Sequence, residues 1–137
     1  MLGAVVAGGV IGVALRELLL LPFGSGATPA GSLALPSATM GVNVVGSFAL
    51  GLVVGWLGDG HPVARAFLGT GVLGGFTTYS AFAVQTATLL GSQPLAGAAL
   101  ALVSVLLGLL AAAIGFRLVQ RPPGAASGAS SEPAASP

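Results

Sequence analysis

Gly71-Val72-Leu73-Gly74-Gly75-Phe76-Thr77-Thr78-Tyr79-Ser80-Ala81-Phe82 is the stretch that decides the fold, because it lies within a hydrophobic segment long enough to cross a bilayer. Its glycines weaken a helix, and polar side chains gather directly after them. Lipid cannot solvate the backbone of an interrupted helix, so a break at this depth has to be buried in protein, hydrated or bound to an ion. We therefore expect a transmembrane helix broken at its centre, and the break is the first candidate for a permeation site.

Composition places the whole chain in a membrane. Of its 137 residues, 55% are hydrophobic and only 5% are charged, and the mean hydropathy is +1.02. Soluble domains carry about 25% charged residues. The net charge of +1 gives no reason to expect nucleic-acid binding, and the lack of cysteine excludes disulfides and iron–sulfur clusters. We interpret the N-terminal apolar run as a retained span, not a signal peptide, and expect a multi-pass protein of the cell membrane.

Hydropathy predicts four transmembrane helices, since each needs roughly 20 mostly apolar residues. We place them at residues 2–21, 37–57, 63–90 and 95–118. Turn-forming residues separate them at 22–36, 58–62 and 91–94. The prediction is an all-α transmembrane domain, residues 1–118, followed by a C-terminal tail, residues 119–137, whose Pro, Gly, Ala and Ser content indicates disorder.

Small residues spaced four apart occur in every predicted span. The pairs are Gly8/Gly12, Gly51/Gly55, Gly71/Gly75 and Gly108/Ala112. In lipid, small residues let helix backbones approach closely, although glycine-rich helices also contain such pairs by chance. Together the pairs predict a tightly packed bundle with more helix contacts than one subunit offers. We therefore expect an oligomer, most simply a dimer.

Polar side chains inside the spans are few, and none near a span centre is acidic. They are Arg16, Glu17, Asn43, Ser47, Thr70, Thr77, Thr78, Tyr79, Ser80, Gln85, Thr86, Thr88 and Ser104. This set contains no His, Asp and Glu cluster for a transition metal, no Ser-His-Asp set and no carboxylate pair, so we do not expect an enzyme. The neutral hydrogen-bond donors that remain suit a path for a weakly coordinated anion.

Asn43 is the most distinctive of these side chains. It lies on the second span, one helical turn before Ser47. An asparagine at such a position either makes a hydrogen bond between helices or presents its amide to a pore. Its spacing alone leaves both interpretations open.

Three strings resemble the signatures of the Fluc (CrcB) fluoride channels. The second span carries Thr39-x-x-Val42-Asn43-x-x-Gly46-Ser47-Phe48-x-x-Gly51. Residues 71–82 are similar to the family string Gly-Phe-x-Gly-Gly-Phe-Thr-Thr-Phe-Ser-Thr-Phe, and the first span carries Gly8-Gly9-x-x-Gly12-x-x-x-Arg16. The strings occur in the family's order, and the resemblance as a whole covers about residues 8–116.

The resemblance implies a dimer of four-helix subunits inserted in opposite orientations, with two narrow anion pores. It also implies a structural sodium ion at the dimer centre, held by the backbone carbonyls of Gly74 and Thr77. A break frees carbonyl oxygens, which are suitable ligands for an alkali cation. Close packing of helices is the alternative explanation of the glycines.

The resemblance also implies an ion path. The path residues are Asn43, Ser47, Tyr79, Ser80, Phe82 and Ser104. Aromatic rings have positive edges, so the rings at positions 79 and 82 would meet an anion without a full charge that traps it. Without the resemblance, Phe82 would be an ordinary core or lipid-facing residue. Tyr79, Ala81 and Leu100 stand where the family has phenylalanine, threonine and an aromatic residue, so we expect part of the family's polar track to be missing.

Arg16 has two interpretations. An arginine near a helix end commonly extends its head group to the membrane interface. The resemblance instead implies an aqueous vestibule, where Arg16 would attract anions. Glu17 follows on a different face of the helix, so we expect that it does not simply neutralise Arg16.

The arginines are distributed unevenly between the two membrane sides. Arg65, Arg117 and Arg121 are predicted on one side and Arg16 near the other. By the positive-inside rule, this favours both termini in the cytoplasm. A fixed orientation would favour a heterodimer with an oppositely inserted homologue, whereas a homodimer should show little bias.

We therefore predict a passive fluoride channel subunit that exports cytoplasmic fluoride and confers fluoride resistance. One alternative is a non-conducting or half-functional subunit that pairs with an oppositely oriented homologue. A second alternative is a small proton-coupled exporter. Such an exporter would need a carboxylate at the membrane centre, and Glu17 lies too near the helix end.

Overall fold

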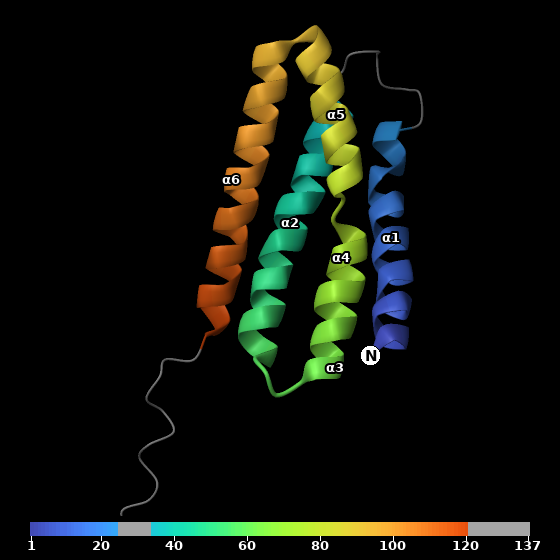
Figure 1. Cartoon of the computed structure of the whole chain (residues 1–137), viewed down its shortest axis with the longest axis vertical. Coiled ribbons are helices and arrows are strands. Elements are labelled where there is room, and N and C mark those ends of the chain that lie inside the picture. Colours follow the sequence, from blue (N-terminus) through green and yellow to red (C-terminus); the bar gives the residue numbers. More distant parts are fainter. Residues whose placement is uncertain (25–33, 121–137) are drawn as a thin grey trace, which may run out of the picture.

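The computed structural model describes residues 1–24 and 34–120, and the regular structure within these ranges is helical. Three spans are continuous helices: α1 (Leu2–Gly24), α2 (Ala34–Leu57) and α6 (Pro94–Val119). The third span is divided into α3 (Pro62–Arg65), η1 (Ala66–Leu73), α4 (Gly74–Phe76) and α5 (Tyr79–Ser92). Consecutive spans run in opposite directions, so the N-terminus and the end of α6 lie at the same end of the bundle (Figure 1).

The four predicted spans are confirmed, since four helical segments are long and apolar enough to cross a membrane. Each helix extends beyond its predicted bounds, and the predicted loop at 22–36 is too long. α2 already begins at Ala34, because Pro36 lies in its first turn, where backbone N–H groups have no partner in the helix. Residues 121–137 of the predicted tail, Arg121 included, lie outside the described residues, whereas Val119 ends α6 and Gln120 is its C-cap.

Glycines allow the helices to pack backbone against backbone. α1 packs along η1 and α4, and α2 packs along α6. A Cβ atom at Gly12 would meet the carbonyl oxygen of Val72, and one at Gly51 would meet that of Ala112. The small-residue pattern of the sequence therefore marks the real contact faces of α1 and α2.

On α6, Ala112 of the predicted Gly108/Ala112 pair lies at the close contact with α2, and the glycine packed there is Gly115 and not Gly108. A Cβ atom at Gly115 would meet the carbonyl oxygen of Phe48. At Gly108, an added Cβ atom would lie 3.4 Å from Ser47 Oγ, an ordinary contact. The two helices thus approach most closely toward the end of α6.

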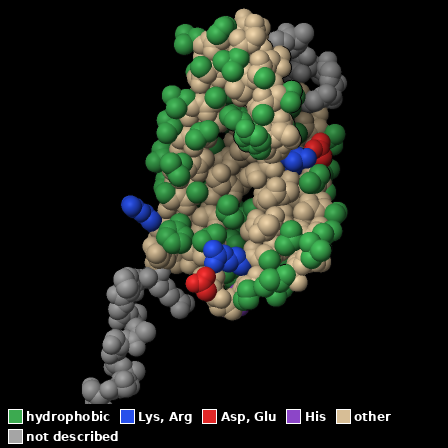
Figure 2. Space-filling model, viewed as in Figure 1, with side chains coloured by type: hydrophobic (Ala, Val, Ile, Leu, Met, Phe, Trp, Pro, Cys, Tyr) green, Lys and Arg blue, Asp and Glu red, His purple; other side chains and the backbone are tan. Residues whose placement is uncertain are grey.

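Little apolar surface is buried within one chain. Among the described residues, Val42 and Leu89 are the buried hydrophobic side chains, and Thr39 is fully buried. Apolar side chains are spread over the face in Figure 2, where the few charged groups include the ion pairs Arg16–Glu17 and Arg65–Asp59. Lipid solvates such a surface, so this distribution is that of a multi-pass membrane protein.

The third span takes a wider helical form before it breaks. η1 is a π-helix, and the backbone N–H of Gly74 reaches the carbonyl of Gly69, five residues earlier. Such segments are rare and occur frequently at functional sites. The interruption follows at Thr77 and Thr78, so the break lies just after the glycines.

Candidate ion-permeation site

The third span is interrupted by two residues with extended backbone. Thr77 has φ −78° and ψ 151°, and Thr78 has φ −137° and ψ 113°. They join the end of α4 to the start of α5, as the thin link between the two ribbons shows (Figure 1). Extended residues leave backbone N–H and C=O groups without helical partners, and at membrane depth these groups need other ones.

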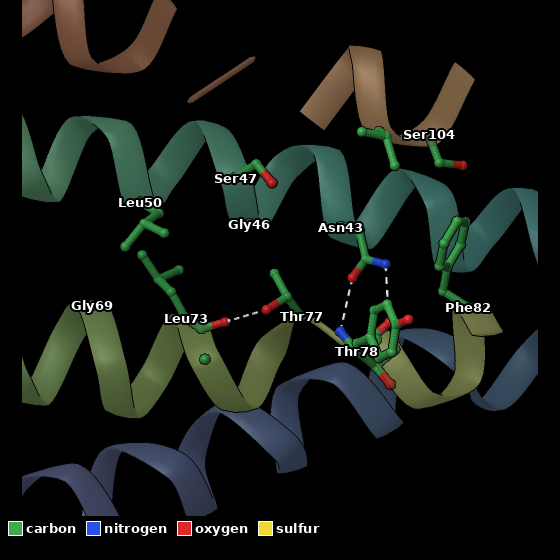
Figure 3. Close-up of a pocket in the computed structure, with 13 residues that line it drawn as sticks. Asn43, Gly46, Ser47, Leu50, Gly69, Leu73, Thr77, Thr78, Phe82 and Ser104 are labelled. Atoms are coloured by element: carbon green, nitrogen blue, oxygen red, sulfur yellow. Dashed lines mark hydrogen bonds between the residues drawn. The ribbon is translucent and has the colours of Figure 1, made fainter. Parts of the chain in front are cut away.

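Asn43 supplies both partners to the peptide groups of Thr78. The Thr78 N–H donates to Asn43 Oδ1 at 2.8 Å, and Asn43 Nδ2 donates to the Thr78 carbonyl at 3.1 Å (Figure 3). A primary amide offers one donor and one acceptor side by side, which matches the backbone groups of an extended residue. Asn43 therefore joins α2 to the break and keeps part of its amide free for other contacts.

The two threonines cap the helix ends on either side of the break. The hydroxyl of Thr77 donates to the Leu73 carbonyl at 2.9 Å, and its N–H donates to the same oxygen at 3.0 Å. The hydroxyl of Thr78 accepts from the Ala81 N–H at 3.3 Å and is the N-cap of α5. One threonine thus ends the first half-helix, and the other begins the second.

These contacts withdraw donors from two carbonyl groups at the break. In a continuous helix, the carbonyls of Gly74 and Thr77 would accept from the N–H groups of Thr78 and Ala81. Those N–H groups donate to Asn43 and to the Thr78 hydroxyl instead. Within residues 1–24 and 34–120, no group of three or more His, Cys, Asp or Glu side chains could hold a metal. Backbone oxygens are ligands that the break offers, and they suit an alkali cation.

A cavity of about 320 Å³, here called the break cavity, lies beside the interruption. Its lining residues are Asn43, Gly46, Ser47, Leu50, Gly69, Leu73, Gly74, Thr77, Thr78, Tyr79, Phe82, Ser104 and Val105. The cavity brings together five of the six predicted path residues and both predicted sodium ligands. The exception among the path residues is Ser80.

The break cavity also contains a ring pair and a buried hydroxyl. The rings of Tyr79 and Phe82 are tilted by 50°, with centroids 6.5 Å apart. Ser104 Oγ is buried and has no hydrogen-bond partner among the described residues. A buried hydroxyl without a partner is costly unless a ligand or water completes it.

A second cavity of about 740 Å³, here called the Arg16 cavity, lies on the other side of Thr78. Its lining residues are Arg16, Glu17, Leu20, Leu21, Leu35, Thr39, Thr78, Ser80, Ala81, Val84 and Gln85. Ser80 is exposed here, with its hydroxyl 3.3 Å from that of Thr78. Thr78 lines both cavities, so the predicted path residues divide between two chambers with this residue at their boundary.

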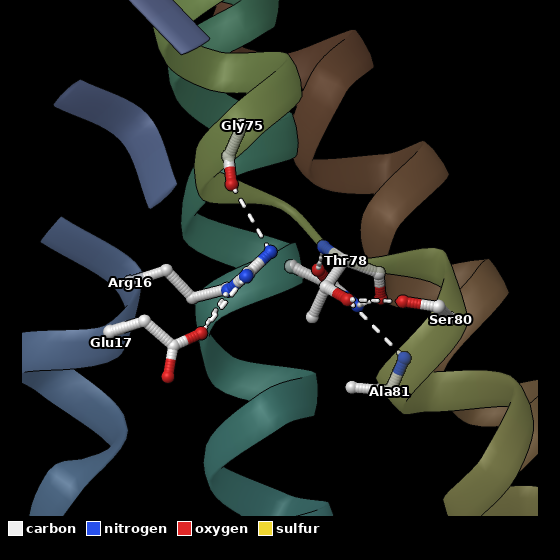
Figure 4. A network of polar contacts seen from close by, with 7 residues as sticks. Arg16, Glu17, Gly75, Thr78, Ser80 and Ala81 are labelled. Carbon is white, nitrogen blue, oxygen red and sulfur yellow. Dashed lines mark hydrogen bonds and ion pairs between the residues drawn. The ribbon is translucent and has the colours of Figure 1, made fainter. Parts of the chain in front are cut away.

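The expectation that Glu17 does not neutralise Arg16 is wrong. Arg16 Nη2 and Nε lie 2.9 and 3.2 Å from Glu17 Oε1 (Figure 4). Adjacent Cβ atoms do point to different sides of a helix, but the long side chains bend toward each other. The third nitrogen, Nη1, donates to the Gly75 carbonyl at 3.3 Å.

Sequence reasoning assigned no role to three polar residues that help to build the site. Thr78 is buried, binds Asn43 and caps α5. Gln85 Nε2 donates to Thr39 Oγ1 at 3.0 Å, which joins α5 to α2 beside the Arg16 cavity. The sequence does place these polar residues on the second span and beside the break of the third span. Which of them form hydrogen bonds with each other can be seen only in the fold.

Comparisons with known proteins point to one family. The family model described as CrcB-like protein, Camphor Resistance (CrcB), matches residues 3–116. The chain is 45% identical over 121 residues to the fluoride-specific ion channel FluC of Hyphomonas neptunium, which covers 83% of this chain and 91% of that protein. It is 37% identical over 127 residues to FluC of Sphingopyxis alaskensis, with 87% and 94% covered. It is 38% identical over 120 residues to FluC 2 of Bacillus subtilis, with 86% of each chain covered.

Proposed function

The chain belongs to the CrcB family of fluoride-specific ion channels, and from this premise we propose that its subunit conducts fluoride passively through the break cavity. It is a membrane channel protein and not an enzyme. Hydrogen fluoride enters a cell as a neutral weak acid and ionises inside. A selective passive path lets the anion leave down its electrochemical gradient, so the proposed role is fluoride export and fluoride resistance.

The observation that carries the proposal is the collection of uncharged polar groups around one helix break. The amide of Asn43, the hydroxyls of Ser47 and Ser104, and the rings of Tyr79 and Phe82 line one cavity. Such dipoles replace the water around an ion without a full charge that would hold it too tightly, and conduction needs this balance. The Ser104 hydroxyl, which lacks a partner within the described chain, is a donor that fluoride would complete.

The proposed path continues past Thr78 into the Arg16 cavity. Ser80 provides an exposed hydroxyl there, and Ala81 provides none. We propose that this cavity, which Arg16 and Glu17 line together, is the aqueous vestibule at this end of the path. The polar track has fewer hydroxyl groups here than in the family pattern. This departure keeps one alternative open, namely a subunit that conducts only beside a paired homologue.

Fluoride efflux from liposomes tests the proposal. Purified protein is reconstituted in vesicles loaded with fluoride, and vesicles loaded with chloride are the matched control. Release of fluoride with retention of chloride supports the proposal, and fluoride release only after a paired homologue is added supports the alternative. Vesicles that hold fluoride with every native subunit supplied contradict the proposed function.

We propose that the carbonyls of Gly74 and Thr77 hold a structural sodium ion. Both have lost their helical donors, and both residues line the break cavity. The ion would supply positive charge to these two carbonyl oxygens. The residues of this chain would supply the cage, because Asn43 and the Thr78 hydroxyl keep the competing N–H groups occupied.

Removal of sodium is expected to stop conduction. When a large organic cation replaces sodium throughout purification, fluoride efflux should fall about tenfold or more, because a ligand that binds only the assembled state stabilises it. Added sodium should restore the flux. Added potassium is the matched control and should not restore it. Equal efflux with and without sodium contradicts a structural role for the ion.

We propose further that two subunits assemble in opposite orientations. Tyr79 and Gly74 line the break cavity and are nevertheless exposed in the single chain, with Tyr79 82% exposed. A second subunit over this face would enclose the cavity and bring two sets of freed carbonyls together. A single subunit without its partner would leave the path open at its side.

The charge distribution predicts one fixed orientation. Arg65 in α3 and Arg117 in the last turn of α6 lie at the end of the bundle that also holds the N-terminus (Figure 1). The positive-inside rule places this end in the cytoplasm. A C-terminal reporter that is active only inside should exceed one active only outside by about tenfold, and equal signals would indicate dual insertion and a homodimer.

A further inference from the structure

We propose that Arg16, held in place by Glu17, is a positioning residue of the helix break and acts by occupying the Gly75 carbonyl, not by attracting anions. The proposal rests on the proposed function, because it takes the break as part of the fluoride path. It concerns three contacts: Arg16 Nη1 to the Gly75 carbonyl at 3.3 Å, and Nη2 and Nε to Glu17 Oε1 at 2.9 and 3.2 Å.

The Gly75 carbonyl needs a donor because of the interruption. In a continuous helix it would accept from the N–H of Tyr79. Tyr79 is instead the first residue of α5, beyond the two extended threonines. A carbonyl at this depth has no lipid group to bind, so a donor from another helix stabilises it. Arg16 comes from α1, 59 residues away in sequence.

The position of Arg16 is fixed by backbone contacts. Gly8, Gly12 and Arg16 are spaced by four residues and therefore share one face of α1. Cβ atoms added at the two glycines would meet the backbone of the third span, at Gly12 the carbonyl of Val72. Arg16 is the next residue of this face, and its head group reaches Gly75. The glycine packing between α1 and the third span thus places the guanidinium of Arg16 beside the break.

Glu17 fixes the direction of the guanidinium. It accepts from Nε and Nη2, which lie along one edge of the planar group, and this leaves Nη1 for the Gly75 carbonyl (Figure 4). The guanidinium is rigid, so two contacts on one edge orient the third nitrogen. Arg16 is also largely covered, with 19% of its side chain exposed, whereas Glu17 is 62% exposed.

The pair carries no net charge. A lone arginine in a vestibule concentrates anions by its electrostatic field, and that effect weakens as salt increases. A carboxylate 2.9 Å away offsets the field at longer range and leaves a local dipole. Arg16 therefore holds one peptide group of the break from α1, while Asn43 holds Thr78 from α2.

The test measures fluoride efflux over a range of fluoride concentrations and at two ionic strengths. Arg16→Lys keeps the charge, but one ammonium cannot reproduce the planar fork that serves both Glu17 and Gly75. Glu17→Gln keeps the shape but weakens the hold on Arg16. Both variants should lower the maximal flux about tenfold, the effect of losing one charge-assisted hydrogen bond, with little change in the half-saturating concentration or salt dependence.

Arg65→Lys is the matched control. Arg65 makes the same kinds of contact, to Asp59 Oδ1 at 2.9 Å and to the Gly58 carbonyl at 3.3 Å, but lies in α3, outside both cavities of the proposed path. Its substitution should leave the flux unchanged. Comparable effects of Arg65→Lys and Arg16→Lys would overturn the proposal, because the break would then play no special part.

Two further results would overturn it. One is a wild-type flux in Arg16→Lys. The other is a higher flux in Glu17→Gln at low salt that disappears at high salt, since that result indicates anion attraction by an unmasked Arg16. If Arg16→Lys is recovered only as aggregate, Glu17→Gln at its exposed position gives the deciding result. A wild-type protein that does not conduct fluoride rejects the proposed function itself and is recognised before any variant is compared.

Discussion

Fluoride efflux through the Asn43→Asp channel is expected to fall by at least about a hundredfold. An aspartate can still accept from the Thr78 N–H, but it has no donor for the Thr78 carbonyl, so two oxygens would face each other where Asn43 Nδ2 now donates at 3.1 Å. A negative charge would also face the break cavity. At about 4 Å and an effective dielectric constant of 20, it repels a monovalent anion by about 4 kcal/mol, or roughly a thousandfold in rate.

Asn43→Ser separates these two effects. Serine removes the amide that spans both backbone groups of Thr78 but adds no charge, so its flux should lie between those of the wild type and Asn43→Asp. All three proteins are compared in liposomes with equal amounts of folded protein. Undiminished flux in Asn43→Asp would remove Asn43 from the path and leave it as a link between helices.

Gly12→Ala is expected to destabilise the subunit by about 2 kcal/mol, because overpacking a well-packed contact costs about 1–3 kcal/mol. The added Cβ atom would meet the carbonyl oxygen of Val72 and lie 2.8 Å from the N atom of Phe76. Both are backbone atoms, so no side chain can move aside and α1 has to separate from the third span. The separation also draws Arg16 away from Gly75. The midpoint of thermal unfolding in detergent should fall by roughly 10 °C.

Gly9→Ala is the matched control for this prediction. Gly9 lies three residues away on α1, and an added Cβ atom there has nothing within 4 Å. Alanine favours a helix over glycine by about 1 kcal/mol, so this change should leave stability equal or slightly higher. Equal loss of stability in Gly9→Ala and Gly12→Ala would contradict a specific contact between α1 and the third span.

Most of the fold could be predicted from the sequence, because the properties that decide it are local. Hydropathy located four spans, and the small residues on α1 and α2 marked the contact faces. The π-helical form of η1 could not be predicted, because glycine spacing does not show whether an N–H reaches four or five residues back. The close contact of Gly115 on α6 was not predicted, because the crossing point of two helices depends on their packing.

The site was less predictable, because its contacts join distant residues. Asn43 and Thr78 are 35 residues apart, and sequence alone left open whether the asparagine binds a helix or lines a pore. It binds the break and lines the cavity at once. The prediction that Glu17 does not neutralise Arg16 was wrong for a different reason. Neighbouring Cβ atoms point to different sides of a helix, but these two long side chains are flexible enough to meet.

The position of Thr78 between the two cavities has a consequence for inhibition. Thr78 lines both cavities, so in the proposed path it forms the partition between them. A blocker too wide for that partition stays in the chamber through which it entered. The two mouths of the proposed path would then differ in pharmacology, with the rings of Tyr79 and Phe82 on one side and the paired Arg16 and Glu17 on the other.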